Sequence, residues 1–520
     1  MSQCGVLVCG AGPVGLTAAL ELVRHGVRPR IIDANDAPTE MSKALVVWRR
    51  TLKALDSGVS FERFLESHDA VESAKFTSEG REIAKLDLTE GQESNHAIPT
   101  GVLIPQSATE QLLLQALAQH GIEVERATRL TSFKQLGDGV EVTIESGVGS
   151  EQSRVDWLLG CDGGHSSIRK GLGLEFPGES LDHLWLIGDV SIDQESNARQ
   201  IQIEFDSHGL VAMFPIGTKR WRIFADLGKY TEKVRKSNLN DVQRVLDERT
   251  STGWTATEAH WLSHYTVNER QIEEYKHGRV VLAGDSAHVH SPAGGQGMNT
   301  GMQDAQNIAW KLALYMRGGA GESLLNTYQE ERHPIGRFVV EGSGRLLKSA
   351  MLTNVVARTA RNTLVHFAMA VPMIRRRFRD ALSEDALDYC KSSLSDGSGS
   401  KRLRSGEMLP NATVEVDGEE VSLYHLLRGN SVTLIVVGDS IPEGLPERFG
   451  YDEAGFQIEV KRLGPGGDAE DPEGATSALL GGEGSLVLLR PDAVVATMTN
   501  TPGDIKHWID TRLIDGVLQR

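Results

Sequence analysis

A glycine-rich turn near the start of the chain restricts its possible folds more than any other segment. An apolar run at 6–9 leads into the spacing G-x-G-x-x-G, and apolar residues then recur at helical intervals until Gly26. A second apolar run at 29–32 ends in Asp33, which completes a βαβ unit. Glycine permits the tight turn and lets a pyrophosphate approach the backbone, so the unit predicts a dinucleotide site in which Asp33 binds a ribose hydroxyl. The turn residues expected to contact the dinucleotide are Gly10, Gly12, Pro13, Val14 and Gly15.

A second glycine-rich segment, at 284–299, follows an apolar strand and precedes a helix predicted at 302–316. Asp285 at the end of that strand can bind a polyhydroxy chain, and the N–H groups that open the helix can bind an anionic ring edge. The two glycine-rich loops lie far apart in the sequence, and together they indicate one extended ligand that both of them bind. His288 and His290 are interpreted as hydrogen-bonded loop residues, because no third side chain has metal-ligand spacing, and no metal site is predicted.

A third segment places Asp-Gly-Gly at 162–164, directly after the apolar strand predicted at 155–159. Taken alone, this tripeptide predicts only a turn. Its interpretation depends on the two glycine-rich segments that lie on either side of it in the sequence.

Length, charge and cysteine content narrow the class of protein. At 520 residues the chain exceeds what one hydrophobic core serves, so two or three domains are expected. Its net charge of -17 disfavours nucleic acid and anionic lipid surfaces as partners. The cysteines form no C-x-x-C pair and no export signal precedes the first strand, which favours a cytoplasmic protein. The apolar stretch 350–372 contains charged residues, so we expect an amphipathic helix packed on the body of the protein, with no membrane span.

The periodicity of the sequence predicts an α/β protein built in several parts. Alternating strands between 181 and 270 indicate a sheet-rich insertion, after which the α/β pattern returns, so the first domain is discontinuous. A segment rich in Ser and Gly at 392–405 is predicted to be a linker. A separate βα pattern follows it, with strands at 432–437 and 485–489.

Together the three segments resemble the class A flavoprotein aromatic hydroxylases, the family of p-hydroxybenzoate and phenol hydroxylases. The nearer likeness is to the larger members that act on phenols and polyketides. The most specific part is the run 283–312, which contains Gly-Gly-Gln-Gly-Met-Asn. The resemblance implies a Rossmann-type FAD-binding domain like that of glutathione reductase, an inserted sheet-rich substrate domain and a C-terminal thioredoxin-like domain. That last domain lacks cysteines, so it cannot carry out dithiol exchange. The implied parts are the FAD-binding domain at 1–180 and 271–345, the substrate domain at 181–270, a helical connection and linker at 346–400, and the thioredoxin-like domain at 401–520.

The resemblance also implies which residues hold noncovalent FAD. The glycine turn and Asp33 would bind the ADP half, Asp285 the ribityl chain, and Met298 and Asn299 would offer N–H groups to the ring. Lys43 stands where many relatives have arginine. Because lysine lacks the planar, forked guanidinium group of arginine, its contact with the flavin would differ. The further positions carried over are Arg50, Gln106, Asp162, Pro292, Gly295 and Gly297.

The substrate is expected between the loop 292–297 and one face of the inserted sheet. Catalytic side chains are not identified, and the substrate-facing candidates are Met213, Arg222, Phe224 and Pro292. Arg222 would stabilise a phenolate or carboxylate, although an arginine at a sheet rim is more often solvated.

The reaction implied is hydroxylation of an aromatic ring by NAD(P)H and O2 through a C4a-hydroperoxyflavin, with the flavin as the source of the chemistry. The expected partners are a small aromatic substrate, O2 and NAD(P)H, with no nucleic acid and no membrane, and a homodimer is left open. Three alternatives remain at this stage. They are a flavin halogenase, whose Trp-x-Trp-x-Ile-Pro segment is missing, another FAD oxidoreductase, and an FAD-containing protein that binds a ligand without turnover.

Overall fold

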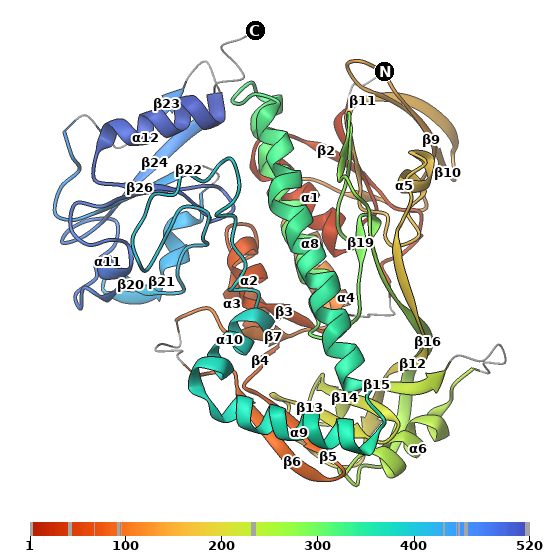
Figure 1. The fold of residues 1–520 in the computed structure, drawn as a ribbon. Helices are drawn as coiled ribbons and strands as arrows, with labels where there is room; N and C mark the ends of the chain where they lie inside the picture. Colours follow the sequence, from red (N-terminus) through yellow and green to blue (C-terminus); the bar gives the residue numbers. More distant parts are fainter. Residues whose placement is uncertain are drawn as a thin grey trace.

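The computed structural model describes residues 4–39, 44–66, 68–90, 94, 96–229, 236–429, 432–443, 445, 448–451 and 456–514. Two large sheets lie one above the other, and a C-terminal unit packs beside the upper one (Figure 1). The long helix α8 (Ser323–Ala350) runs along both levels. None of the helices in these ranges is long and apolar enough to cross a membrane.

The first sheet has the strand order β17-β18-β11-β1-β2-β8, with β9 and β10 attached to β11. Strands β18, β11, β1, β2 and β8 are parallel neighbours, which is the doubly wound arrangement predicted from the βαβ unit. The strands are β1 (Cys4–Cys9), β2 (Pro29–Ile32), β8 (Val124–Glu125), β9 (Arg129–Gln135), β10 (Val140–Ser146), β11 (Gly149–Gly160), β17 (Lys276–His277) and β18 (Val280–Leu282).

Helices α1 and α7 pack closely together, and α1 also packs against α4. Their side chains join the strands in one large apolar core. A small sheet, β3-β7-β4, lies between the two large sheets. These elements and their neighbours are α1 (Pro13–Arg24), β3 (Val46–Trp48), α2 (Arg49–Leu55), α3 (Phe61–Leu65), β4 (Asp69–Ala70), β7 (Gly101–Leu103), α4 (Gln106–Gln119), α5 (Ser167–Gly171) and α7 (Gly297–Met316).

The second sheet has the order β19-β16-β12-β15-β14-β13-β5-β6. The range 181–270 predicted for this part contains most of its strands but omits β5 and β6, which come from earlier in the chain, and β19, which comes later. Strand β13 pairs in parallel with β5, a contact between segments more than a hundred residues apart. The strands and the helix that covers one face are β5 (Ser73–Ser78), β6 (Arg81–Asp87), β12 (Gly178–Ile192), β13 (Gln200–Asp206), β14 (Gly209–Pro215), β15 (Arg220–Lys229), α6 (Leu239–Arg249), β16 (Ala256–Gln271) and β19 (His288–Val289).

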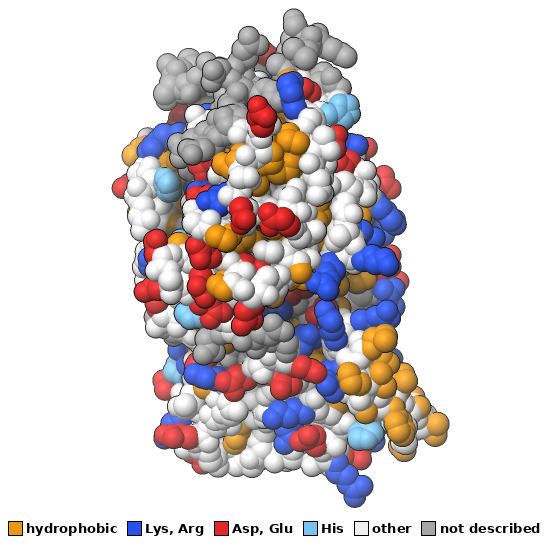
Figure 2. Space-filling model, turned by 90° about the vertical axis from the view of Figure 1, so that its left-hand side faces the viewer, with side chains coloured by type: hydrophobic (Ala, Val, Ile, Leu, Met, Phe, Trp, Pro, Cys, Tyr) orange, Lys and Arg blue, Asp and Glu red, His pale blue; other side chains and the backbone are white. Residues whose placement is uncertain are grey.

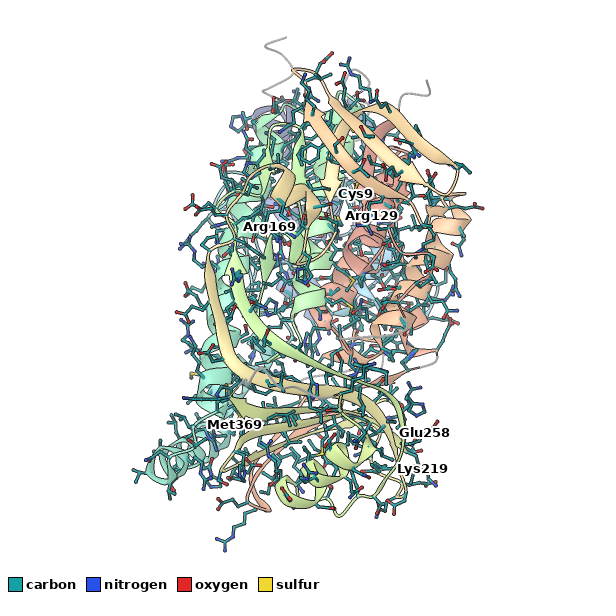
Figure 3. All side chains as sticks on the ribbon, turned by 90° about the vertical axis from the view of Figure 1, so that its right-hand side faces the viewer. Cys9, Arg129, Arg169, Lys219, Glu258 and Met369 are labelled. Atoms are coloured by element: carbon teal, nitrogen blue, oxygen red, sulfur yellow. The ribbon has the colours of Figure 1, made fainter. Side chains whose placement is uncertain are left out.

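After α8, two helices, α9 (Val355–Ala370) and α10 (Pro372–Leu382), lie across the outer edge of the second sheet. Figure 3 shows Met369 on this pair of helices, beside that sheet. The C-terminal unit follows, with a sheet of order β23-β24-β22-β25-β26. Its elements are β20 (Thr413–Val416), β21 (Glu419–Ser422), β22 (Val432–Val437), β23 (Arg448–Tyr451), β24 (Phe456–Leu463), α11 (Ala475–Leu479), β25 (Leu486–Leu489), β26 (Val495–Thr499) and α12 (Pro502–Ile509).

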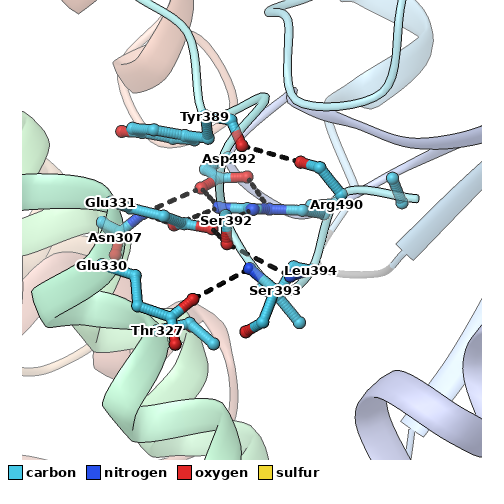
Figure 4. A network of polar contacts seen from close by, with 12 residues as sticks. Asn307, Thr327, Glu330, Glu331, Tyr389, Ser392, Ser393, Leu394, Arg490 and Asp492 are labelled. Atoms are coloured by element: carbon cyan, nitrogen blue, oxygen red, sulfur yellow. Dashed lines mark hydrogen bonds and ion pairs between the residues drawn. The ribbon is translucent and has the colours of Figure 1, made fainter. Parts of the chain in front are cut away.

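A buried network of charges joins the C-terminal unit to α8 (Figure 4). Arg490 donates two hydrogen bonds to the Glu331 carboxylate, at 2.6 and 2.9 Å, and Lys311 donates a third at 2.7 Å. Ser392, at the start of the predicted linker, donates to the same carboxylate at 2.8 Å. Arg490 and Lys311 hold the pKa of Glu331 well below its usual range, against the effect of burial. The segment 392–405 therefore connects the two parts as a packed structure, because both Ser392 and Ser405 are buried.

Candidate active site

The glycine turn adopts the conformation that its sequence predicts. Gly10 has φ +101°, and a Cβ there would lie 2.3 Å from the carbonyl oxygen of Cys161. A Cβ on Gly15 would lie 1.8 Å from the Gly10 carbonyl oxygen, so both positions exclude a side chain. Gly12, at the N-terminus of α1, has no atom within 4 Å of its Cβ direction, and no side chain caps this helix end. The N-terminus of α1 is therefore open to an anionic ligand.

Asp33 follows β2 and lies directly beside the glycine turn. Its carboxylate accepts hydrogen bonds from the backbone N–H groups of Ala11, at 2.6 Å, and Asn35, at 2.8 Å. Arg126 lies 3.8 Å from the same carboxylate, and its Nη2 atom is buried without a partner. Arg126 is not among the predicted residues, because only the pairing of β2 with β8 brings residue 126 beside Asp33.

Gln106 begins α4 at the same end of the site. Its side chain donates to Glu110 at 2.9 Å, and its backbone N–H donates to the Ala44 carbonyl at 3.0 Å. Burial raises the pKa of Glu110, and the charges of Arg126 and Asp33 act on it in opposite directions. The structure thus brings Gln106, Glu110, Arg126 and Asp33 into one polar cluster beside the first βαβ unit.

Asp162 lies in the turn after β11, where Cys161 donates its N–H to the Cys9 carbonyl at 2.8 Å. One carboxylate oxygen of Asp162 accepts from the N–H groups of Ser167, at 2.7 Å, and Ile168, at 3.2 Å. The other oxygen is buried and has no partner in the protein. The Asp-Gly-Gly segment is therefore a turn, as expected from its sequence, and it also presents an unsatisfied acceptor.

The second glycine segment lies against the first. A Cβ on Gly284 would lie 2.8 Å from the Val14 side chain, and one on Gly301 would lie 2.7 Å from it. Asp285 is exposed between these close contacts. Helix α7 begins at Gly297, five residues before the predicted start at 302, and no side chain caps it. The open first turns of α1 and α7 therefore belong to helices that pack together.

The loop before α7 is held in place by β3. Trp48 donates its indole N–H to the Gly294 carbonyl at 2.9 Å, and its backbone N–H to the Asn299 side chain at 2.8 Å. Asn299 donates in turn to the Val46 carbonyl at 2.9 Å. Within the loop, Gly295 donates its N–H to the Pro292 carbonyl at 2.9 Å. The Asn299 side chain therefore orients the loop, while its backbone lies in the open first turn of α7.

The two histidines of the second glycine segment have different surroundings. His288 is buried and contacts the Asp304 carboxylate at 2.7 Å, which Arg332 also contacts at 2.7 Å. His290 contacts the Ser291 carbonyl through Nδ1 at 2.7 Å, and its Nε2 atom is buried without a partner. Burial lowers the pKa of His290 to about 4, so the ring is neutral near pH 7 and Nε2 is an acceptor. In the described part of the chain, no group of three or more His, Cys, Asp or Glu side chains could hold a metal ion.

The face of the second sheet nearest this loop is lined by aromatic side chains. Phe224 stacks on Trp185 at 4.6 Å between ring centroids and on Tyr265 at 5.9 Å. Ala293 of the loop packs against the same cluster. Phe214, which is partly buried, joins this cluster to a second one around Trp48. Leu347 and Ala350 of α8 belong to the same cluster, in which Trp185 and Phe224 are buried and Tyr265 is partly exposed. This cluster is an apolar wall beside the loop, and a substrate site there stays a prediction.

Two of the substrate-facing predictions do not fit this wall. Met213 pairs with Ile223 across the strands and packs on the α6 side, opposite to Phe224, so the expectation of a shared face is wrong for Met213. Arg222 is on the Phe224 side but is 2% exposed and paired with Asp189 at 2.7 Å. It is neither solvated at a rim nor free to meet an anion, because Asp189 and the Ala44 carbonyl accept its hydrogen bonds.

Three buried polar atoms without a protein partner test whether FAD fits these residues. They are the donor Nη2 of Arg126 and the acceptors Oδ1 of Asp162 and Nε2 of His290. Buried polar groups are normally hydrogen-bonded, so three orphans on loops around two open helix N-termini indicate a missing polar ligand. A dinucleotide with hydroxyl, phosphate and ring N–H groups supplies complementary partners, and the residues present fit FAD.

Comparison with known proteins assigns the family. The family described as "FAD binding domain" matches residues 3–343. The chain belongs to this FAD-binding family. It is 32% identical to 6-methylpretetramide 4-monooxygenase of Streptomyces rimosus, over 96% of this chain and 91% of that protein. The class A aromatic hydroxylase resemblance is thereby confirmed.

Solved structures extend the similarity over the whole length of this FAD-binding protein. The aromatic hydroxylase CabE from angucycline biosynthesis superposes with a TM-score of 0.77 at 26% identity, covering 99% of each chain. Anhydrotetracycline hydroxylase from Streptomyces rimosus gives a TM-score of 0.78 at 26% identity, covering 98% of this chain and 99% of that one. The protein is a flavin-dependent aromatic monooxygenase. One relative is named for a different activity: dialkyldecalin synthase of Streptomyces rugosporus is 28% identical over 94% of this chain and 95% of its own length.

Two of the predicted flavin contacts of this monooxygenase, Lys43 and Arg50, are not confirmed by the structure. Lys43 lies outside the described residues. Arg50 is buried in α2, donates to the Leu387 carbonyl at 2.6 Å and lies 5.4 Å from the centre of the Tyr389 ring. These contacts tie α2 to the segment after α10, so a direct contact of Arg50 with FAD stays a prediction.

Proposed function

We propose that this monooxygenase hydroxylates a polycyclic aromatic substrate of the polyketide class, with NAD(P)H as reductant and O2 as oxygen donor. The observation that carries the proposal is the aromatic wall of Trp185, Phe224 and Tyr265, in which Tyr265 is partly exposed and against which Ala293 of the loop packs. Flat rings stack favourably on such a wall. The polyketide monooxygenases among the relatives support the same substrate class.

Bound FAD supplies the electron transfer and oxygen activation, and the protein supplies binding and orientation. Asp33 and Arg126 would hold the adenosine end, and Asp285 the ribityl hydroxyls. The first turn of α7 would direct its N–H groups at the pyrimidine edge of the ring, where a positive helix end favours negative charge. Asn299 keeps that turn in register with β3 through two side-chain hydrogen bonds.

The substrate side of the site works mainly by excluding water. Phe224 and Pro292 remain our candidates for contact with the substrate, and Phe214 joins them because it is partly buried between two apolar clusters. Arg222 would act indirectly, since its guanidinium lies 5.3 Å from the Trp261 ring centre and holds that ring in the wall. A dry, apolar wall protects an oxygen-transferring group from side reactions with water.

For the C-terminal unit we propose a thioredoxin-like fold with a structural role. Its central strands β22 and β24 are parallel and β25 and β26 are antiparallel to their neighbours, a mixed sheet that supports this fold. It has no cysteine, so it cannot exchange dithiols. The choice between NADH and NADPH, the cytoplasmic location and the homodimer stay predictions.

Labelled dioxygen tests the proposed reaction. With a phenolic polyketide as substrate, NAD(P)H oxidation should accelerate, and one labelled oxygen atom should enter the product ring for each reductant molecule productively consumed. A product that gains its oxygen from water would contradict the proposal. A product that is cyclised without gaining oxygen would instead favour a synthase activity like that of the dialkyldecalin synthase relative.

A further inference from the structure

The helix α9 is packed with its charged side toward the protein and its apolar side toward solvent. Arg358 is 8% exposed and donates to Glu79, while Arg361 is 7% exposed and donates to the Ala350 carbonyl at 3.0 Å. The Arg361 guanidinium also lies 4.3 Å from the Phe205 ring centre. The sequence-based expectation of an amphipathic helix on the body is correct, but the apolar side faces the opposite way.

The outward side of α9 and α10 collects apolar side chains. Of the twelve large apolar residues that are exposed in the described part of the chain, eight lie between Leu352 and Ile374. We call six of these the α9–α10 face: Val355, Val356, Leu364, Phe367, Met373 and Ile374. Their exposed fractions range from 44% to 77%. Soluble monomers rarely expose so many large apolar side chains in one group. Figure 2 shows hydrophobic side chains gathered at the lower right, where they project beyond the rest of the outline.

The charge around this face is opposite to that of the whole protein. The segment 352–382 contains six arginines and one aspartate, whereas the chain has a net charge of -17. Arg376 is 76% exposed, and Arg377 is exposed beside it at the end of the apolar group. Three acids lie at this face, where Glu79 pairs with Arg358, Glu90 with Arg375 and Arg379, and Asp380 with Arg376. The arginines still outnumber these acids, and charges farther away than about 10 Å are largely screened at physiological salt, so the local excess of positive charge sets the potential here.

We propose that the α9–α10 face binds the surface of an anionic lipid bilayer. Helices with Leu, Phe and Val on one side and arginine beside them lie in the headgroup region, with the apolar side chains buried and the cations at the lipid phosphates. A second copy of the chain fits less well. A two-fold contact would set this face against a copy of itself, in which arginines outnumber acids, so the second copy offers Arg376 and Arg377 few acidic partners. The projecting face also contrasts with the grooves in which proteins bind an apolar helix.

Sedimentation with sucrose-loaded vesicles tests this inference on the FAD-loaded, full-length protein. Binding is expected with vesicles of phosphatidylglycerol and phosphatidylcholine and should be much weaker with phosphatidylcholine alone. The double variant Leu364→Ser/Phe367→Ser should lower the partition coefficient by about tenfold or more, because it removes two inserted side chains. Arg376→Gln/Arg377→Gln should lower it by roughly tenfold for anionic vesicles only.

The matched control is Phe338→Ser/Leu346→Ser, which removes two exposed apolar side chains of α8 outside the face, at 52% and 44% exposure. This control should bind vesicles like the unchanged protein. Absence of binding to anionic vesicles, or equal losses in the control and in Leu364→Ser/Phe367→Ser, would overturn the proposal. So would a dimer in sedimentation velocity that Leu364→Ser/Phe367→Ser converts to monomer, since the face would then be an interface between copies. Bound FAD and the unfolding midpoint report whether each variant is folded.

Discussion

Arg222 and Asp189 lie opposite each other on β15 and β12 and form a buried ion pair with two hydrogen bonds, of 2.7 and 3.0 Å. Both side chains are 2–3% exposed. A buried pair of this kind fixes geometry, and it leaves an uncompensated charge when one partner is removed. Arg222, which the sequence predicted to contact the substrate, is therefore a buried structural residue of the sheet.

Replacing Arg222 by Met should therefore destabilise the protein by about 3–5 kcal/mol, because Asp189 would remain buried without its main partner. Urea unfolding measures this loss. The control is Arg220→Met, whose side chain is 46% exposed and 3.5 Å from the same carboxylate, and which should cost less than about 1 kcal/mol. If the Arg222→Met variant kept its stability and lost only affinity for a phenolate, Arg222 would be a substrate ligand after all.

Asp285 provides a test of the cofactor site. Asp285→Ala should weaken FAD binding roughly 10- to 150-fold, since hydrogen bonds to a charged acceptor contribute about 1.5–3 kcal/mol. Flavin fluorescence on titration of the apoprotein gives the Kd. Asp182→Ala, an exposed aspartate of β12, is the control and should leave the Kd unchanged. An unchanged Kd in folded Asp285→Ala would place the ribityl chain elsewhere.

Glu384 should make stability depend on pH. It is fully buried and accepts from Thr300 at 3.0 Å and from Gln303, and burial raises its pKa from 4.5 to about 7. Between those pH values the folded protein binds more protons at this group than the unfolded chain. Its contribution to stability is therefore complete below pH 4.5 and is lost as the pH rises to about 7, by about 3 kcal/mol at most.

Glu384→Gln removes this titration, so the stability difference between variant and unchanged protein should shift in favour of the variant as the pH rises. Denaturant unfolding at pH 5, 6, 7 and 8 measures it. The control Glu66→Gln, with a side chain 61% exposed, should leave the pH profile as it is. Parallel pH profiles for Glu384→Gln and the unchanged protein would show that Glu384 stays ionised in the folded state.

The network around Glu331 predicts how firmly the C-terminal unit is attached. Arg490→Met should cost about 3–5 kcal/mol, because it leaves Glu331 buried with one cation fewer. Arg404→Met, with a side chain 60% exposed, is the control and should cost less than about 1 kcal/mol. Stability is read from urea unfolding and FAD content from the absorption spectrum.

Truncation after residue 400 follows the same reasoning. Any soluble, FAD-loaded product should still reduce FAD, because the last unit has no redox pair. The yield should be low, since the cut removes Arg490 from Glu331 and also removes Leu409 and Tyr424, which uncovers the apolar residues of the main core that they pack against. A well-folded, FAD-loaded truncation without FAD reduction would show that the last unit takes part in the chemistry.

Much of the fold could be predicted because it depends on local sequence. Strands β2 and β22 have the predicted ends. Apolar periodicity and glycine turns determine such elements over a few residues. Long-range contacts could not be predicted. Strands β5 and β6 join the second sheet through a parallel pair with β13, and their own sequence carries no signal of that partner.

For the site, the sequence by itself determined the candidate FAD-binding residues that follow from local chain geometry: Gly10 and Gly15, where a side chain has no room, and Asp33 and Asp285, which follow apolar strands. The tertiary structure decided the rest. The cross-strand register placed Met213 away from Phe224, and burial paired Arg222 with Asp189. Packing also turned the arginines of α9 inward, because Glu79 and the Ala350 carbonyl lie there to accept their hydrogen bonds. Local sequence specifies which surfaces a segment can present, whereas the partners that lie opposite decide which one is buried.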